Sequence, residues 1–266
     1  MRIERLSAAV LLLVMAASAT TVTIDETLRY QTIEGIGAFG AADAWWKGLS
    51  SYFNQAFVDL VVGDLGLSMS RNEYYPPDDP ACQLPDQIPY LRAIKTRAET
   101  LGQEMKFIAT YWTPPSWFKD NGSLKNGGHA KPGMYDSLAS YCVQTVRRYK
   151  NEAGIDLYAL SFANEPRFVE PYNSCVWTEA EYRDFVKVVG PRFAQQGIAT
   201  KLFGPEDMLD RFIPYAGYIN ADPAAKPWLG ALAVHARACP ASGSMPARHR
   251  CWQRPRGRAA RCTASG

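Results

Sequence analysis

A chain of 266 residues, 47% of them hydrophobic, is long enough to form one domain with a substantial core. Its net charge of +3 is unevenly distributed: residues 1–19 and 236–266 together hold 9 Arg and 1 Glu, which leaves 20 Lys and Arg against 25 Asp and Glu in residues 20–235. This mildly acidic central part argues against a nucleic-acid-binding surface, because it has no basic stripe to neutralise phosphates.

The first nineteen residues predict a secretory signal peptide. Arg2 and Arg5 give a basic start, residues 6–15 are apolar, and residues 17–19 (ASA) are the small residues of a cleavage site. The apolar stretch is too short to span a bilayer, and no later segment is long enough. We therefore expect a mature protein that begins near Thr20, is secreted or periplasmic, and makes no membrane contact.

Strand and helix patterns alternate along residues 31–235, which predicts a parallel sheet covered by helices. Before them, two short β-prone segments flank a polar turn and predict a small hairpin over residues 22–33. The predicted strands are 35–40, 67–71, 105–112, 157–163, 200–203 and 229–234, and the predicted helices are 53–65, 88–101, 134–150, 179–196 and 209–219.

Six predicted strands and five intervening helices fit an incomplete TIM (β/α)8 barrel of the α/β class. A closed barrel needs two more strand–helix units. We therefore predict that residues 20–235 form a partial barrel domain. The hairpin is then the remnant of a side β-structure that precedes the barrel.

The tail over residues 236–266 has a different composition. It contains no Ile, Leu, Val, Phe or Tyr, its basic residues are all Arg apart from one His, and it is rich in Ala, Pro and Cys. We expect it to be disordered. Two interpretations stay open: a reading frame translated out of register, which the composition favours, or a genuine arginine-rich binding tail.

The six cysteines lie in both parts of the chain, three in the body and three in the tail. None has the CxxC or ligand spacing of a zinc site, so we expect no metal and no cofactor. Cys142 falls in a predicted helix and is expected to be buried. Cys82 and Cys175 fall in predicted loops, and export permits a disulfide between them.

Polar and aromatic side chains follow the predicted strands. An apolar strand ends at Asn164 and Glu165, and Pro166 then stops it. Barrel enzymes place catalytic groups at this end of their strands. Aromatic rings stack on the C–H faces of sugars, and carboxylates and amides bind hydroxyls, so these strand ends predict a sugar-binding cleft. The other candidates at strand ends are Trp45, Trp46, Arg71, Asn72, Glu73, Tyr74, Tyr75, Tyr111, Trp112, Trp117, Glu206 and His235.

Four segments occur in one order across about four-fifths of the chain: 31–38 (QTIEGIGA), 111–117 (YWTPPSW), 119–128 (KDNGSLKNGG) and 161–166 (SFANEP). With them the chain resembles glycoside hydrolase family 30. This family of retaining enzymes includes glucuronoxylanases, β-1,6-glucanases, endo-β-1,6-galactanases and glucosylceramidases.

The resemblance implies a role for each matching residue. Glu165 would be the acid/base, and Asn164 would hydrogen-bond the 2-hydroxyl of the sugar. Arg71 would steady the nucleophile, Trp112 would line the subsite where cleavage occurs, and His235 would line the cleft from the sixth strand. The remaining substrate-binding candidates are Trp46, Tyr75, Trp117 and Glu206.

Retaining glycosidases need two carboxyl groups about 5–5.5 Å apart. The family takes its nucleophile from the end of the seventh strand, and no residue of this sequence matches that position. Glu206 and Glu73 are near enough to strand ends to lie in the cleft, but neither matches the nucleophile. We therefore expect that the nucleophile is absent and that this copy is inactive.

The expected function is that of an exported retaining O-glycoside hydrolase for β-linked polysaccharide: xylan, β-1,6-galactan or β-1,6-glucan. The partner would be the glycan alone, and the protein would be a monomer. The alternative is a non-catalytic carbohydrate-binding protein that keeps the aromatic rim. An unrelated exported α/β protein is disfavoured by the ordered motifs.

Overall fold

The computed structural model describes residues 27–28, 32–40 and 54–236. The predicted signal peptide, most of the predicted hairpin, Trp45, Trp46 and the tail after Ala236 lie outside the described residues. The chain divides into two units, residues 1–34 and 35–266, and the elements below all belong to the second.

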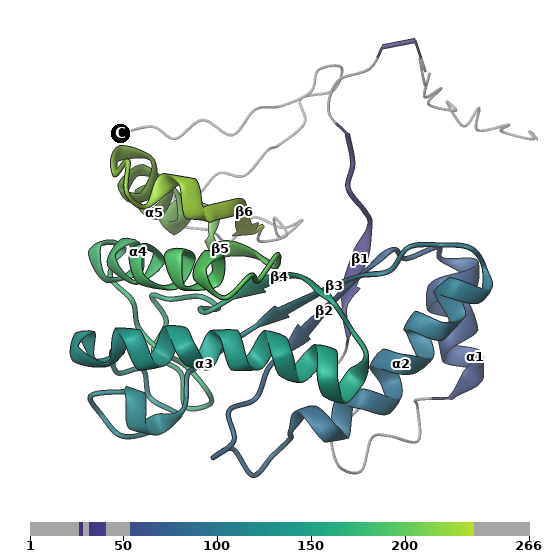
Figure 1. The fold of residues 1–266 in the computed structure, drawn as a ribbon, viewed down its shortest axis with the longest axis horizontal. Helices are drawn as coiled ribbons and strands as arrows, with labels where there is room; N and C mark the ends of the chain where they lie inside the picture. The colour runs from purple at the N-terminus through teal and green to yellow at the C-terminus, as the bar shows by residue number, and fades with distance from the viewer. Residues whose placement is uncertain (1–26, 29–31, 41–53, 237–266) are drawn as a thin grey trace, which may run out of the picture. The chain divides into compact units, whose positions relative to one another are not determined.

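Six parallel strands form one sheet in the order β1-β2-β3-β4-β5-β6 (Figure 1). Each strand pairs with the next strand along the chain, as in a (β/α)8 barrel. The six described strands therefore make an incomplete barrel, which confirms the predicted fold class. Their bounds are β1 Gly37–Phe39, β2 Met69–Glu73, β3 Lys106–Thr110, β4 Leu157–Ser161, β5 Lys201–Met208 and β6 Leu229–His235.

Helices connect the strands, and α2, α3 and α4 lie in front of the sheet in Figure 1. The first connection is a short α-helix that continues as a π-helical turn rather than one regular helix. No helix among the described residues is long and apolar enough to cross a membrane. The bounds are α1 Gln55–Val58, the π-helical turn Asp59–Asp64, α2 Leu84–Thr100, α3 Tyr135–Arg148, α4 Glu179–Gln195 and α5 Leu209–Ala221.

Local capping explains where two helices start. The Thr178 side chain accepts from the backbone N–H of Glu181 at 3.2 Å, and the Glu181 carboxylate accepts from the N–H of Thr178 at 2.7 Å, so α4 starts at a capping box. Gln83 and Asp86 make the equivalent pair for α2. That helix begins at Leu84 rather than at residue 88 as predicted, because Gln at the cap is a weak sequence signal.

Strand β5 also differs from its prediction. It continues through Gly204 and Pro205 to Met208, whereas the sequence pattern ended it at Phe203. Proline is rare inside strands, which is why the pattern stopped there. The pairing of β5 with β6 shifts register between Pro205 and Asp207, which accommodates the irregular backbone.

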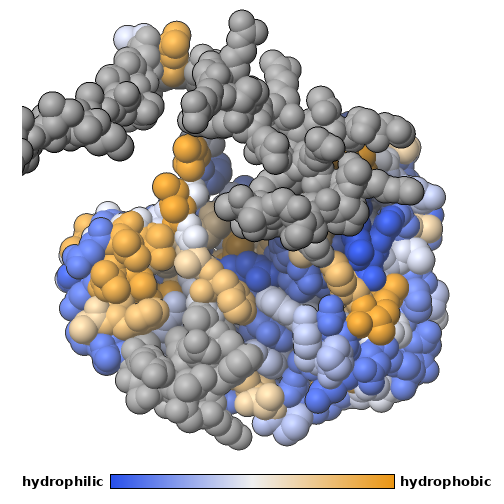
Figure 2. Space-filling view, turned by 180° about the vertical axis from the view of Figure 1, so that it is seen from behind, coloured by the Kyte–Doolittle hydropathy of each residue, from blue (hydrophilic) through white to orange (hydrophobic). Residues whose placement is uncertain are grey.

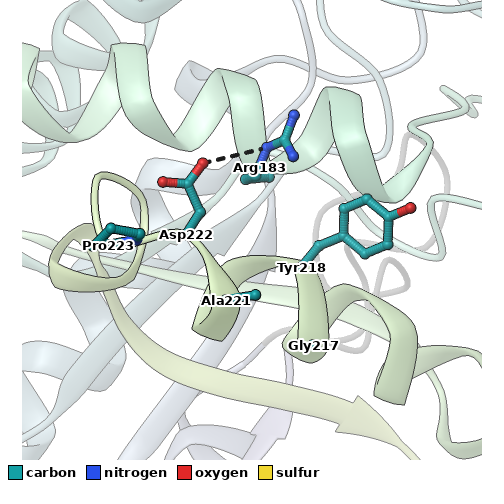
Figure 3. Close-up of a pocket in the computed structure, with 6 residues that line it drawn as sticks. All are labelled: Arg183, Gly217, Tyr218, Ala221, Asp222 and Pro223. Carbon is teal, nitrogen blue, oxygen red and sulfur yellow. Dashed lines mark ion pairs between the residues drawn. The ribbon is translucent and has the colours of Figure 1, made fainter.

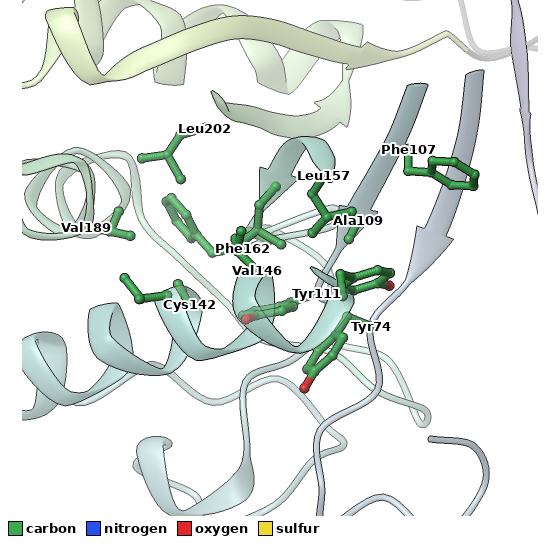
Figure 4. Close-up of a cluster of buried hydrophobic side chains, with 14 of the residues drawn as sticks. Tyr74, Phe107, Ala109, Tyr111, Cys142, Val146, Leu157, Phe162, Val189 and Leu202 are labelled. Carbon is green, nitrogen blue, oxygen red and sulfur yellow. The ribbon is translucent and has the colours of Figure 1, made fainter. Parts of the chain in front are cut away.

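The core lies between the sheet and the helices. Figure 4 shows Cys142 and Val146 of α3 facing Leu157 of β4, with Phe162 between them and Leu202 of β5. Ring contacts extend this core: the Phe162 ring lies 4.8 Å from Phe185 and 5.2 Å from Trp177, both edge-on. The C-terminal ends of the strands are thus anchored to a closely packed hydrophobic core.

The two edge strands are exposed. Among the described strands, β1 pairs only with β2 and β6 pairs only with β5. Leu232 and Val234 of β6 keep 52% and 43% of their surface exposed, and Phe39 of β1 keeps 38%. Figure 2 shows orange, apolar residues at the surface of the molecule. An exposed apolar strand edge is a template for pairing with another chain.

We expect Leu232→Lys to reduce concentration-dependent aggregation, because a charge on an edge strand opposes edge-to-edge pairing. Sedimentation velocity over a concentration series would measure this. Ile213→Lys is the matched control, since Ile213 is 66% exposed on α5 and offers no free strand edge. An equal effect of both substitutions would show that surface hydrophobicity, and not the edge, drives aggregation.

Candidate active site

The Asn164–Glu165 pair follows the C-terminal end of strand β4. Asn164 is 8% exposed, and Glu165 has a left-handed backbone with φ 46°. The backbone N–H of Glu165 donates to the carbonyl of Glu206 at 3.0 Å, which ties the end of β4 to the end of β5. Few side chains tolerate a left-handed backbone, so this turn is held by its surroundings.

Arg71 lies at the centre of the site. Its Nε donates to Oε1 of Glu206 at 2.8 Å, and its Nη2 donates to Oδ1 of Asn164 at 2.8 Å. The guanidinium lies over the ring of Trp112, 4.6 Å from its centroid, and 5.3 Å from that of Phe39. Phe39 pairs with Arg71 in the β1–β2 register, which explains the second ring. Two aromatic rings and two polar partners thus fix a planar cation.

The Glu165 carboxylate contacts a histidine. Its Oε1 lies 2.9 Å from Nδ1 of His235, and the two side chains are 22% and 29% exposed. His235 pairs with Met208 in the β5–β6 register, so β6 carries the ring to Glu165. A partly exposed carboxyl group with a histidine partner can exchange a proton with a bound molecule.

Strand β5 supplies two buried carboxyl groups. Glu206 is 2% exposed and has a left-handed φ of 57°, and Asp207 is fully buried. Burial raises the pKa of Asp207, while the N–H of Met208 and the charges of Arg211 and Arg167 oppose that rise. Among the described residues, neither Oε2 of Glu206 nor Oδ2 of Asp207 has a hydrogen-bond partner.

Glu73 is a further buried carboxyl group, at the end of β2. Burial raises its pKa to about 7, against the opposing effect of hydrogen bonds with Tyr75 and Asn173. Its neighbours Asp79 and Arg71 act in opposite directions, the first raising and the second lowering this pKa. Glu73 therefore holds a proton in mildly acidic solution.

The structure brings most of the predicted residues together. Arg71, Asn164, Glu165, Glu206, His235 and Trp112 form one connected cluster. Tyr75 is 4% exposed, so its ring is covered, and Trp117 is 47% exposed on the loop after β3. Trp46 lies outside the described residues, and the roles of Tyr75, Trp117 and Trp46 in binding stay predictions.

The sequence reading missed Phe39 and Asp207. Phe39 lies at the end of the predicted glycine-rich strand 35–40, and this strand-end position is a signal that could have marked it as a candidate site residue. Asp207 follows Glu206 directly, but the predicted strand 200–203 ends before both residues, whereas the observed strand includes them.

A cavity of about 370 Å³ lies elsewhere, on the surface between α4 and α5 (Figure 3). None of its lining residues belongs to the strand-end cluster, so we do not assign the active site there. The lining residues are Arg183, Gly217, Tyr218, Ala221, Asp222 and Pro223.

The described cysteines take no part in the site. Cys82, Cys142 and Cys175 are buried free thiols, so no disulfide joins Cys82 to Cys175. Burial raises the pKa of each thiol to about 12, which keeps all three protonated. Within the described ranges, no group of three or more His, Cys, Asp or Glu is placed to hold a metal ion.

We expect Arg71→Met to lower the free energy of unfolding by about 3 kcal/mol, because it leaves the Glu206 carboxylate buried without its cation. The Glu206 side chain is 3% exposed in this pair. Urea denaturation would measure the loss. Arg71→Met with Glu206→Leu should recover part of it, as both charges are then absent.

Lys150→Met is the matched control for this cycle. Its ion pair with Asp156 has side chains that are 58% and 81% exposed, so its loss should change stability by less than about 1 kcal/mol. A loss at Lys150 as large as that at Arg71 would contradict the role of burial.

We expect Glu73→Gln to raise the free energy of unfolding above pH 7 and to change it little below pH 4. The folded-state pKa of Glu73 is raised from 4.5 to about 7, so ionisation costs stability as pH rises through that interval. The full effect is at most about 3 kcal/mol. Urea denaturation at pH 4, 6 and 8 would measure it.

Glu99→Gln is the matched control, since the Glu99 side chain is 58% exposed. It should leave the pH dependence of stability unchanged. A pH dependence that survives Glu73→Gln would assign the effect to another group.

Comparison with known proteins identifies the family. Residues 81–252 match the glycosyl hydrolase family 30 TIM-barrel domain. The chain is 25% identical over 250 residues to putative glucosylceramidase 1 of Caenorhabditis elegans, covering 80% of this chain and 47% of that protein. It is 29% identical over 140 residues to the lysosomal acid glucosylceramidase of Mus musculus, covering 49% of this chain and 27% of that protein.

Solved structures show the same likeness. The family 30 subfamily 8 xylanase Xyn30A of Clostridium acetobutylicum has a TM-score of 0.67 and 25% identity, over 81% of this chain and 52% of that one. The endo-β1,6-glucanase BT3312 has a TM-score of 0.67 and 25% identity, over 81% and 55%. The chain spans about half the length of the curated relatives that it matches. With its family domain match, its barrel strands and its strand-end carboxylates, this chain belongs to glycosyl hydrolase family 30.

Proposed function

We propose that this chain supplies the acid/base residue, but not the nucleophile, of a retaining glycosidase site for β-linked polysaccharide. We also propose that the protein is exported. The observation that carries the proposal is the cluster of Arg71, Asn164, Glu165 and His235 at the ends of parallel strands. The names of structural neighbours, a xylanase and an endo-β1,6-glucanase, support xylan and β-1,6-glucan as the first substrates to test.

The proposed role of Asn164 is to bind a sugar hydroxyl. Arg71 donates to its Oδ1, so the amide Nδ2 points away from the guanidinium and can donate to a ligand. Because the Glu165 N–H is bonded to Glu206, whose carboxylate shares Arg71 with Asn164, we infer that a hydroxyl bound by Asn164 would lie near the Glu165 carboxyl group. This juxtaposition fits the assigned roles of binding the 2-hydroxyl and protonating the glycosidic oxygen.

Glu165 can act as acid and then as base. In its protonated form it gives a proton to the leaving oxygen, and as a carboxylate it removes one from the attacking water. His235 lies at hydrogen-bonding distance on Oε1, which fixes the plane of the carboxyl group. The 22% exposure of the Glu165 side chain leaves it accessible to a bound glycan.

For the 266-residue polypeptide alone we propose binding without hydrolysis. A retaining mechanism needs a second carboxylate about 5–5.5 Å from the first to attack the anomeric carbon. Glu206 is the neighbouring carboxylate, but its Oε1 is paired with Arg71 and it is almost fully buried. The second candidate function, a non-catalytic carbohydrate-binding protein, rests on the same observation.

We expect the chain to bind xylan, β-1,6-galactan or β-1,6-glucan, with retardation in affinity electrophoresis through gels that contain each polysaccharide. Trp112→Ala should weaken the retardation, because it removes the ring against Arg71 at the site. Folded protein that migrates equally in all three gels and in a gel without glycan would remove the proposal.

We further expect hydrolysis only after the chain is joined to the C-terminal strand–helix units of a family relative. In that protein Glu165→Gln should abolish cleavage of polysaccharide but spare the first step on an aryl glycoside, whose acidic leaving group needs little protonation. Stopped-flow release of the aryl group would measure this. Robust hydrolysis by the 266-residue chain would show that its nucleophile is among its own residues.

A further inference from the structure

The cavity between α4 and α5 shares no residue with the strand-end cluster and has the size of a small-ligand site (Figure 3). Its volume is about 370 Å³, and ligand pockets range from about 300 to 1,000 Å³. Helix α4 contributes Arg183, and the rest of the lining comes from the C-terminal end of α5 and the residues that follow it. Figure 3 shows Asp222 and Tyr218 on either side of Arg183. The cavity thus brings together an aromatic ring, a guanidinium and a carboxylate.

Gly217 and Ala221 line the cavity one helical turn apart on α5. A Cβ atom added at Gly217 would meet no other atom within 4 Å, so no close packing requires glycine there. Gly190 of α4 differs, because a Cβ atom at that position would overlap the Trp228 side chain. Glycine inside a helix is destabilising relative to alanine. At position 217 it provides open space beside Tyr218.

Ion pairs hold the polar side chains of the cavity in place. Nε and Nη2 of Arg183 lie 2.9 and 2.7 Å from Oδ1 of Asp184, and Nε lies 3.5 Å from Oδ2 of Asp222. Nζ of Lys187 lies 2.9 Å from Oδ1 of Asp184 and donates to Oδ2 of Asp222 at 3.1 Å. The N–H of Ala224 donates to Oδ1 of Asp222 at 2.9 Å. Because two cations face two carboxylates, this group of side chains has little net charge to attract an anion such as phosphate.

These features suit a pyranose, a neutral ligand with an apolar C–H face and a rim of hydroxyls. The Tyr218 ring is 46% exposed and can stack on such a face. The Arg183 guanidinium lies 5.8 Å from the centroid of that ring, so one sugar can contact both. A guanidinium has more N–H groups, and a carboxylate more lone pairs, than the contacts above engage. Arg183 and Asp222 can therefore bind hydroxyls as well as each other.

We propose that the cavity between α4 and α5 is a second carbohydrate-binding site, in which a neutral pyranose stacks on Tyr218 and hydrogen-bonds to Arg183 and Asp222. Such a site keeps a polysaccharide on the protein and takes no part in cleaving it. The ligand class follows from the lining of the cavity, and only the choice of glycans for the test rests on the proposed function.

The test uses the full chain, labelled with nitrogen-15, and hexasaccharides of β-1,4-xylose, β-1,6-galactose and β-1,6-glucose. Titration with at least one of them should shift the backbone amide signals of Gly217 and Ala221 in two-dimensional NMR spectra. Inorganic phosphate at the same concentrations should leave both signals in place. Folded protein in which no hexasaccharide moves these signals, or in which phosphate alone does, would overturn the proposal.

Substitutions then locate the bound sugar. Gly217→Leu fills the open space, and leucine favours a helix more than glycine does, so the fold is kept. The affinity derived from the Ala221 signal should fall by at least about tenfold. Tyr218→Ala should weaken it about fivefold, as expected for the loss of one stacking contact, and Tyr218→Phe should stay within about twofold.

Asn220→Leu is the matched control, because Asn220 is exposed on the same helix and is not among the residues that line the cavity. It should leave the affinity within about twofold of the unsubstituted protein. An equal loss for Asn220→Leu, or an unchanged affinity for Gly217→Leu, would overturn the proposal because the sugar would then bind elsewhere.

The signals of Trp112 and Asn164 report separately on the strand-end cluster. If they shift with a hexasaccharide and those of the cavity do not, the second site is overturned and the proposed function stands. If the cavity signals shift and those of the cluster do not, the second site is supported and the proposed function fails.

Discussion

The candidate site depends on one partly buried cation. Arg71 of β2 donates to Asn164 beyond β4 and to Glu206 on β5, so one guanidinium joins the ends of three strands. Without it the Glu206 carboxylate would be buried without its cation at a cost of several kcal/mol. The rings of Trp112 and Phe39 lie 4.6 and 5.3 Å from the cation and hold it by cation–π contacts. The geometry of Glu165, the proposed acid/base, follows from this arrangement.

Backbone strain is concentrated at the two carboxylate residues that this cation organises. Among the described non-glycine residues, only Asn126, Glu165 and Glu206 have positive φ. Such a conformation costs about 1–3 kcal/mol and persists only where neighbours hold it. Glu165 donates its N–H to the carbonyl of Glu206, so each strained residue supports the other. Strain that coincides with the predicted acid/base strengthens the assignment of this cluster as the functional site.

The sequence predicted the strands and helices more accurately than it predicted contacts between distant side chains. All six predicted strands overlap observed ones, because short apolar runs between turn residues carry their own signal. The predicted C-terminal end of β5 was wrong because Pro205 is rare inside a strand. The predicted start of α2 was wrong because Gln83 is a weak cap signal. The Arg71–Glu206 pair joins residues 135 positions apart, and no local pattern could reveal it. Likewise, the burial of Tyr75 arises from packing of loops, which periodicity does not describe.

The exposed edge strand β6 and the proposed acid/base, Glu165, are physically linked. His235, the partner of Glu165, is the last residue of β6, and β6 has only β5 beside it among the described strands. Strand edges with exposed apolar residues open at a lower free energy than central strands. Arg71, Asn164 and Glu165 come from central strands, so we expect them to keep their positions if β6 opens and the contact with His235 to be lost. Of the two proposed roles, hydroxyl binding by Asn164 therefore depends less on β6, and orientation of the Glu165 carboxyl group depends on how β6 is covered.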